Sequence, residues 1–116
     1  MAEEEDTSKM AEYAAMQNTL NSYKQKLDDL QKKIYQGRSQ GVNIKMYGDY
    51  SIIETTIDQS FYEIASKAQI EKAYLNCLSN LHSAIETEKM NLQEQLNKEI
   101  ERFRVEAMNK QANGSD

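Results

Sequence analysis

One stretch in the middle of the chain constrains the fold more than any other. It reads QGRSQGVNIKMYGDYSIIETTIDQS, and it holds three of the four glycines of a chain without proline. Within it Val42, Ile44 and Met46 alternate with polar residues, the pattern of a strand with one buried face. The residues around it are polar with helical spacing. A helix-rich chain is therefore predicted to contain a β-hairpin at residues 42–57.

The hairpin pattern also predicts a register. Gly48-Asp49 fits a two-residue loop with a type II′ turn. That loop sets three expected pairs, Tyr47 opposite Tyr50, Met46 opposite Ser51 and Ile44 opposite Ile53. Two faces follow from it. The buried face would hold Val42, Ile44, Ile53, Thr55 and Ile57, and the other face would hold Lys45, Tyr47, Tyr50, Ile52 and Glu54. A lone hairpin is marginal in water, so we expect cover from a helix, a second subunit or a third strand at residues 35–40.

Helices are expected on both sides of the hairpin. Apolar residues spaced alternately three and four apart predict a first helix over about residues 10–34, capped by Thr7 or Ser8. Capping boxes begin at Ser60 and Ser66, and one of them starts a final helix that runs to about residue 108. The fold class expected is α+β, with a helix, a hairpin or three-strand meander, and a long C-terminal helix. At 1.5 Å per residue this last helix would project beyond its domain.

The length of 116 residues indicates a single domain. We expect it over residues 10–110, with an acidic disordered tail at 1–9 and a second tail at 111–116. No apolar stretch approaches the roughly 20 residues that span a bilayer, the N-terminus is acidic where a secretory signal is basic and then apolar, and one cysteine fits a reducing compartment. The expected location is the cytoplasm.

The sequence offers little catalytic chemistry. His82 has no second histidine or cysteine at metal-ligand spacing, and Cys77 does not share its helix face. The glycines form no phosphate-binding loop. The carboxylates are spread over predicted helix surfaces, and no nucleophile stands beside a base. We therefore expect no enzyme activity, no catalytic residues, no metal, no cofactor and no small-molecule substrate.

The charge is unevenly distributed along the chain. The net charge is −5, but the segment from Lys9 to Lys45 has seven basic and three acidic residues. An acidic protein with one basic face is possible on this pattern.

The central segment GVNIKMYGDYSIIETTID resembles the signature of the YbaB/EbfC nucleoid-associated family. The matching positions keep their spacing without a gap and are Gly41, Ile44, Met46, Gly48, Ile53, Ile57 and Asp58. The segments QGRSQG, MQNTLNSYKQKLDDLQKKI and IEKAYLNCLSNLHSAI resemble the first strand, the opening helix and the last helix of that family. The likeness covers about residues 14–95. Tyr50, Gln59 and Arg38 depart from the family pattern, which has a turn glycine, a proline and often an acid there.

The resemblance implies an α-β-β-β-α subunit that forms a homodimer through its sheet region and grips double-stranded DNA between helical arms. The location implied is the nucleoid, without membrane association. Tyr47, Tyr50 and Ile52 would then belong to the dimer interface. The DNA would be held by phosphate contacts with low sequence specificity. The basic residues expected to make these contacts are Lys24, Lys26, Lys32, Lys33, Arg38, Lys98, Arg102 and Arg104.

Two alternatives bind protein and no nucleic acid. The helix–hairpin–helix order also resembles a prefoldin-type chaperone subunit, whose arms hold unfolded chains by apolar tips. Phe103, Val105 and Met108 could form such a tip. However, a prefoldin-like arm needs two helices of similar length, and the predicted helices differ. The other alternative is a plain helical scaffold or assembly protein.

Overall fold

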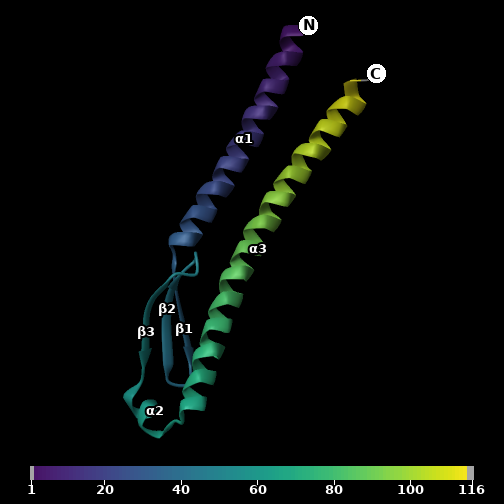
Figure 1. The fold of residues 1–116 in the computed structure, drawn as a ribbon. Coiled ribbons are helices and arrows are strands. Elements are labelled where there is room, and N and C mark those ends of the chain that lie inside the picture. The colour runs from purple at the N-terminus through teal and green to yellow at the C-terminus, as the bar shows by residue number, and fades with distance from the viewer. Residues whose placement is uncertain (1, 115–116) are drawn as a thin grey trace. The chain divides into compact units, whose positions relative to one another are not determined.

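The computed structural model describes the backbone of residues 2–114 and the side chains of residues 10–109. The elements follow the predicted α+β order (Figure 1). They are α1 (Ala2–Lys32), β1 (Ile34–Ser39), β2 (Val42–Tyr47), β3 (Ile52–Ile57), α2 (Gln59–Ile64) and α3 (Lys67–Gly114). The chain divides into two compact units. Unit 1 comprises residues 1–27 and 91–116, and unit 2 comprises residues 28–90.

Unit 2 contains an antiparallel sheet with the strand order β1-β2-β3, which confirms the third strand predicted at residues 35–40. One face of the central strand is fully buried, with Val42, Ile44 and Met46 at 0%, 1% and 4% exposure. Along α3 the buried residues Ala73, Cys77, Leu81 and Ile85 recur every four positions, which is the spacing of one helix face. The alternation of the strand and the stripe of the helix therefore supply the two sides of one core.

The predicted loop and register of the hairpin are wrong. The loop contains three residues, because Tyr47 and Ser51 form the closing pair and the Tyr50 N–H donates to the Tyr47 carbonyl at 2.9 Å. Tyr50 takes the positive φ of 73°, while no glycine within the described backbone has positive φ. A type I turn followed by a left-handed residue is a common three-residue hairpin loop.

The strand pairs shift accordingly. Met46 lies opposite Ile52 where Ser51 was expected, and Ile44 lies opposite Thr55 where Ile53 was expected. Between these pairs the register slips by one residue beside Lys45 and Met46, as at a β-bulge. Ile52 therefore pairs with a residue of the buried face, and its expected place on the outer face is corrected.

Gly48 is required by a close approach and not by its own backbone angles. Its N–H donates to the Lys33 carbonyl at 3.0 Å, and a Cβ atom at this position would lie 1.9 Å from the Leu30 carbonyl oxygen. Any side chain here would displace the end of α1 from the hairpin.

The last helix begins at the second of the two predicted capping boxes. The Gln69 N–H donates to the Ser66 hydroxyl at 3.2 Å, and the Ser66 N–H donates to the Gln69 side chain at 2.8 Å. This reciprocal pair is a capping box. Residues near Ser60 form the separate short helix α2, which begins after Asp58.

The terminal segments differ from the expected tails. The helix α1 begins at Ala2, so residues 2–9 are helical where a disordered tail was expected. The helix α3 continues to Gly114, which includes residues 111–114 of the second expected tail, and residues 115–116 lie outside the described residues. The two compact units subdivide the single domain expected over residues 10–110.

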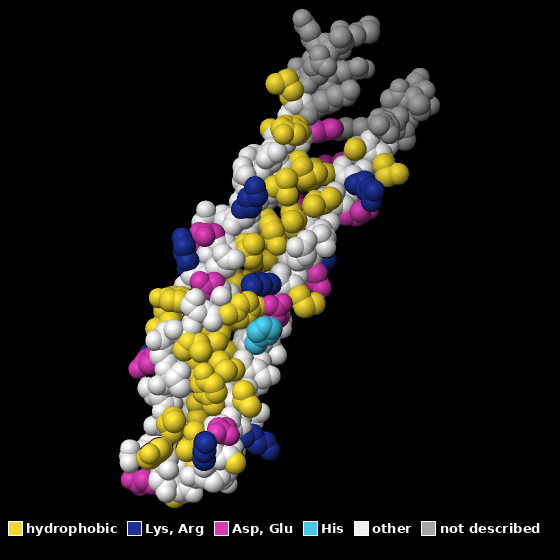
Figure 2. Space-filling model, in the orientation of Figure 1, with side chains coloured by type: hydrophobic (Ala, Val, Ile, Leu, Met, Phe, Trp, Pro, Cys, Tyr) yellow, Lys and Arg dark blue, Asp and Glu magenta, His cyan; other side chains and the backbone are white. Residues whose placement is uncertain are grey.

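Unit 1 is a pair of helical segments, one from α1 and one from α3. Hydrophobic side chains gather between them (Figure 2). Leu96 is the one buried hydrophobic side chain among those described in this unit, and Tyr23 donates a hydrogen bond to Gln93 at 3.0 Å across the pair. A two-helix layer has no second layer to bury it, so most of its side chains stay accessible.

Candidate nucleic-acid interface

A groove of about 500 Å³ runs between the two helical segments of unit 1. Its α1 wall is formed by one stripe of the helix, since Asn18, Ser22 and Lys26 follow one another at intervals of four residues. Gln95 and Lys98 line it from α3. The remaining lining residues are Thr19, Tyr23, Leu92, Leu96 and Glu99.

The groove is chemically suited to contact phosphate oxygens. Amide, hydroxyl and ammonium groups are the side-chain donors that bind the sugar-phosphate backbone of DNA. Two lysines and one glutamate, Glu99, give the lining a local charge of about +1 within a protein of −5. Apart from Tyr23, which donates to Gln93, the lining has no aromatic ring. Such a surface is able to contact the sugar-phosphate backbone of DNA but not to stack on its bases.

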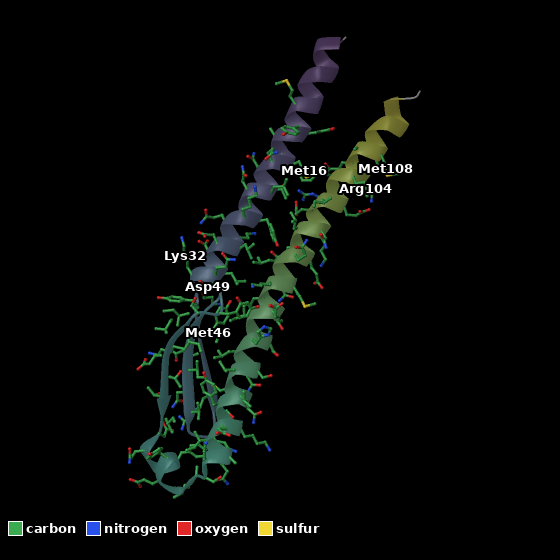
Figure 3. All side chains as sticks on the ribbon, viewed as in Figure 1. Met16, Lys32, Met46, Asp49, Arg104 and Met108 are labelled. Atoms are coloured by element: carbon green, nitrogen blue, oxygen red, sulfur yellow. The ribbon has the colours of Figure 1, made fainter. Side chains whose placement is uncertain are left out.

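The five predicted DNA contacts in unit 1 fall into two groups. Lys24, Lys26 and Lys98 make no ion pair with any carboxylate among the described side chains. Arg102 pairs with Glu99 at 2.8 Å and Arg104 with Glu101 at 3.7 Å, each at a spacing of three residues. Arg104 belongs to the C-terminal part of α3 (Figure 3). Exposed pairs of this kind are weak, so both guanidinium groups remain available to exchange partners.

The three predicted contacts in unit 2 are all paired. Lys32, on the last turn of α1 (Figure 3), pairs with Asp28 at 3.0 Å, and this hydrogen bond raises the pKa of Lys32. Lys33 pairs with Glu88 at 2.9 Å, and Arg38 pairs with Asp58 at 2.7 Å. These last two pairs join segments far apart in the sequence. Their first role is therefore to hold unit 2 together.

The Glu88 carboxylate is the centre of one such connection. It accepts a hydrogen bond from the Tyr35 hydroxyl at 2.5 Å and one from Lys33. These two bonds lower the pKa of Glu88, and burial together with the same bond raises the pKa of Tyr35. The arrangement fixes β1 to α3.

Asp58 is the centre of a second connection. Its carboxylate accepts hydrogen bonds from Arg38 at 2.7 Å and from Asn43 at 3.0 Å. Its backbone N–H donates to the Gly41 carbonyl at 2.8 Å. Asp58 thus ties β1, β2 and the start of α2 together, and Arg38 is part of this structural network.

The predicted interface residues Tyr47, Tyr50 and Ile52 do not form one surface. Tyr47 and Ile52 are exposed at 39% and 48%. Tyr50 instead turns toward α3, where its ring stacks on His82 with 4.8 Å between ring centroids and its hydroxyl donates to Glu86. Lys89 lies 4.4 Å from the centre of the same ring. The expected grouping of Tyr50 with Tyr47 is corrected, because Tyr50 lies in the hairpin loop with a positive φ and its side chain contacts α3.

Sequence reasoning did not identify the polar residues of the groove. Asn18, Ser22 and Gln95 carry no charge and were not among the predicted contacts. The signal available was the spacing of Asn18, Ser22 and Lys26, which places all three on one stripe beside the apolar seam. Which stripe faces the second helix is decided only by the fold.

Within the described residues, no group of three or more histidine, cysteine, aspartate or glutamate side chains is arranged to hold a metal ion. None of the described helices is both long and apolar enough to cross a membrane. The lone Cys77 is buried against the backbone of Ile44, and burial raises the pKa of its thiol.

Comparison with known proteins gives a likeness of fold. No family model matches the chain, and no curated protein matches it. Among solved structures, the chain is similar to the crystal structure of the uncharacterized protein HP0035 from Helicobacter pylori, with a TM-score of 0.59 and 18% sequence identity. The match covers 72% of this chain and 89% of the other. At this identity the likeness concerns the fold alone.

Proposed function

We propose that the protein is a nucleoid-associated, homodimeric DNA-binding protein that holds duplex DNA through phosphate contacts from its helical segments. The observation that carries this proposal is the groove of unit 1, where Lys26 and Lys98 join Asn18, Ser22 and Gln95. Side chains of these types are the usual donors to the DNA backbone. The resemblance of the central segment to YbaB/EbfC proteins supports the same function.

The charge of the protein sets the expected character of binding. Phosphate contacts release counterions, so affinity falls steeply as salt rises. A net charge of −5 repels the polyanion at long range, so we expect binding to be strongest at low salt. The groove offers no arrangement of side chains for reading base edges, and we expect duplexes of different sequence to bind with similar affinity.

The test is fluorescence anisotropy of a labelled duplex of about 30 base pairs at several salt concentrations, with a fixed protein preparation. Binding should saturate, and the logarithm of the association constant should fall linearly with the logarithm of salt. In the double variant Lys26→Ala/Lys98→Ala the slope should decrease by about 0.9 for each phosphate that the variant no longer neutralises.

The matched control is Lys45→Ala/Lys67→Ala, which removes two exposed lysines of unit 2 and so changes the net charge equally. It should leave the slope unchanged. Equal effects of the two double variants would show a nonspecific response to charge and would overturn the assignment of the groove. No binding of the unmodified protein at low salt would refute the proposal.

A second candidate is a protein-binding role, favoured by exposed apolar side chains in unit 1. Met10, Tyr13, Val105 and Met108 are exposed at 71%, 68%, 46% and 62%, whereas the expected tip residue Phe103 is only partly exposed. The described helices remain unequal, with 31 and 48 residues, which argues against a prefoldin-like arm. Suppression of the aggregation of a denatured client, abolished in Met10→Ser/Met108→Ser, would favour this role over DNA binding.

A further inference from the structure

The groove of unit 1 has one acidic residue in its described lining, and this residue binds an arginine. Glu99 is the single carboxylate among the residues that line the groove. Its Oε2 atom lies 2.8 Å from a guanidinium nitrogen of Arg102. The groove lysines, Lys26 and Lys98, make no ion pair with Glu99 or with any other described carboxylate. Glu99 therefore leaves both lysines available and occupies the arginine.

Arg102 lies on the side of α3 that faces the groove. Gln95 and Glu99, which line the groove, precede it by seven and three residues, and these intervals place all three on one face of a helix. Because its guanidinium is bound to a lining carboxylate, that group lies at the edge of the groove. A DNA backbone held in the groove would pass within reach of Arg102, whose planar set of donors matches the geometry of phosphate oxygens.

We propose that Glu99 competes with DNA phosphate for Arg102 and thereby weakens DNA binding. This inference rests on the DNA binding of the proposed function and adds a positioning residue to it. In the free protein the Glu99 carboxylate binds the guanidinium within one helical turn. Arg102 can bind phosphate only after this ion pair breaks, so part of the free energy of the new contact is lost.

The exposure of the ion pair sets the size of this competition. The side chains of Glu99 and Arg102 are 44% and 61% exposed, and an ion pair with this exposure is weak enough for phosphate to replace it. After the exchange the unpaired carboxylate remains in the groove wall beside the phosphates, and the like charges repel each other. The competition should reduce the contribution of Arg102 to the association constant by about two- to fivefold.

The same helix contains a matched ion pair outside the groove. Glu101 and Arg104 pair at 3.7 Å with the same spacing of three residues, and both are exposed. Neither residue lines the groove, and Glu101 follows Glu99 by two positions, which is about 200° around the helix. This second pair is therefore a control for the loss of an exposed ion pair and for an equal change of net charge.

The experiment consists of two double-mutant cycles in the full-length chain. Association constants are measured for a labelled duplex of about 30 base pairs at one low salt concentration. The first cycle combines Glu99→Gln with Arg102→Ala, and the second combines Glu101→Gln with Arg104→Ala. Each cycle gives the loss of affinity caused by the arginine substitution, with and without the carboxylate. Glutamine has nearly the helix propensity of glutamate, so circular dichroism should show all variants folded like the unmodified protein.

Arg102→Ala should weaken binding by about two- to fivefold more in the Glu99→Gln background than in the unmodified protein. Glu99→Gln alone should strengthen binding more than Glu101→Gln does. Arg104→Ala should weaken binding equally with and without Glu101. A purely structural ion pair would change the melting temperature but would give no coupling in DNA binding.

Two results would overturn the competition and leave the DNA binding in place. One is an equal loss of affinity from Arg102→Ala with and without Glu99, and the other is the same coupling in both cycles. No binding of the unmodified protein at low salt would overturn the proposed function and this inference with it.

Discussion

The two compact units place their charged and apolar residues very differently. Of the ten buried hydrophobic side chains among the described residues, nine lie in unit 2 and one, Leu96, lies in unit 1. The predicted basic contacts of unit 2 are engaged in ion pairs, two of which join distant segments, whereas Lys24, Lys26 and Lys98 of unit 1 make no ion pair with a described carboxylate. Unit 2 thus uses its side chains to hold the fold, and unit 1 leaves them available for a ligand.

The largest expected effect is the loss of folding stability when a buried side chain is truncated in either unit. Ile44→Ala should lower the free energy of unfolding by about 2–5 kcal/mol, because Ile44 is 1% exposed in the centre of unit 2. Leu96→Ala should lower it by about 2 kcal/mol at most, since a two-helix layer relaxes more easily around a truncated side chain. Urea unfolding followed by circular dichroism measures both. Equal decreases in the free energy of unfolding would show that buried side chains stabilise unit 1 as much as unit 2.

A smaller effect is expected at Tyr50, where backbone strain and side-chain contacts oppose each other. Tyr50→Ala should lower the free energy of unfolding by about 1–3 kcal/mol. Alanine keeps the unfavourable positive φ and removes both the stack on His82 and the hydrogen bond to Glu86. Tyr50→Gly should destabilise by about 1 kcal/mol less, because glycine adopts this φ without strain. Thermal melts of both variants give the comparison. If glycine proved no better than alanine, strain at this position would be unimportant.

The smallest effect concerns the pH dependence contributed by Glu88. Its pKa in the folded protein is lowered by Tyr35 and Lys33, so its stabilisation is present above the unfolded pKa, near 4.5, and is lost as pH falls through the folded value. Glu88→Gln should therefore flatten the decrease in stability on the acid side of about pH 4.5. Urea midpoints at a series of acid pH values measure this, with Glu94→Gln as the control of equal charge change. An unchanged acid limb would contradict the role given to Glu88.

The element order was predictable because each element has a local signal. The alternation of Val42, Ile44 and Met46 and the capping box at Ser66 depend on a few neighbouring residues. The register was not predictable for the opposite reason. Gly48 resembled the first residue of a type II′ turn, but its lack of a side chain serves the approach of the Leu30 carbonyl. The left-handed residue is Tyr50, which is held in place by contacts with α3.

The candidate site shows the same division. Lys26 and Lys98 were predicted from charge, and the fold places both in one groove. Arg38 and Lys33 looked equivalent to them in the sequence. Their partners Asp58 and Glu88 lie 20 and 55 residues away, so only the folded chain distinguishes a structural ion pair from an available cation.

Mapping DNA binding onto the two units by NMR would decide whether unit 1 is the part that binds. Amide chemical shifts of isotopically labelled full-length protein would be recorded with increasing amounts of a duplex of about 30 base pairs at low salt. We predict the largest changes in unit 1, at residues 18–26 of α1 and 95–98 of α3, with small changes around Arg38 and Lys45. Changes concentrated in unit 2, or none at saturating duplex, would contradict the division of roles between the units.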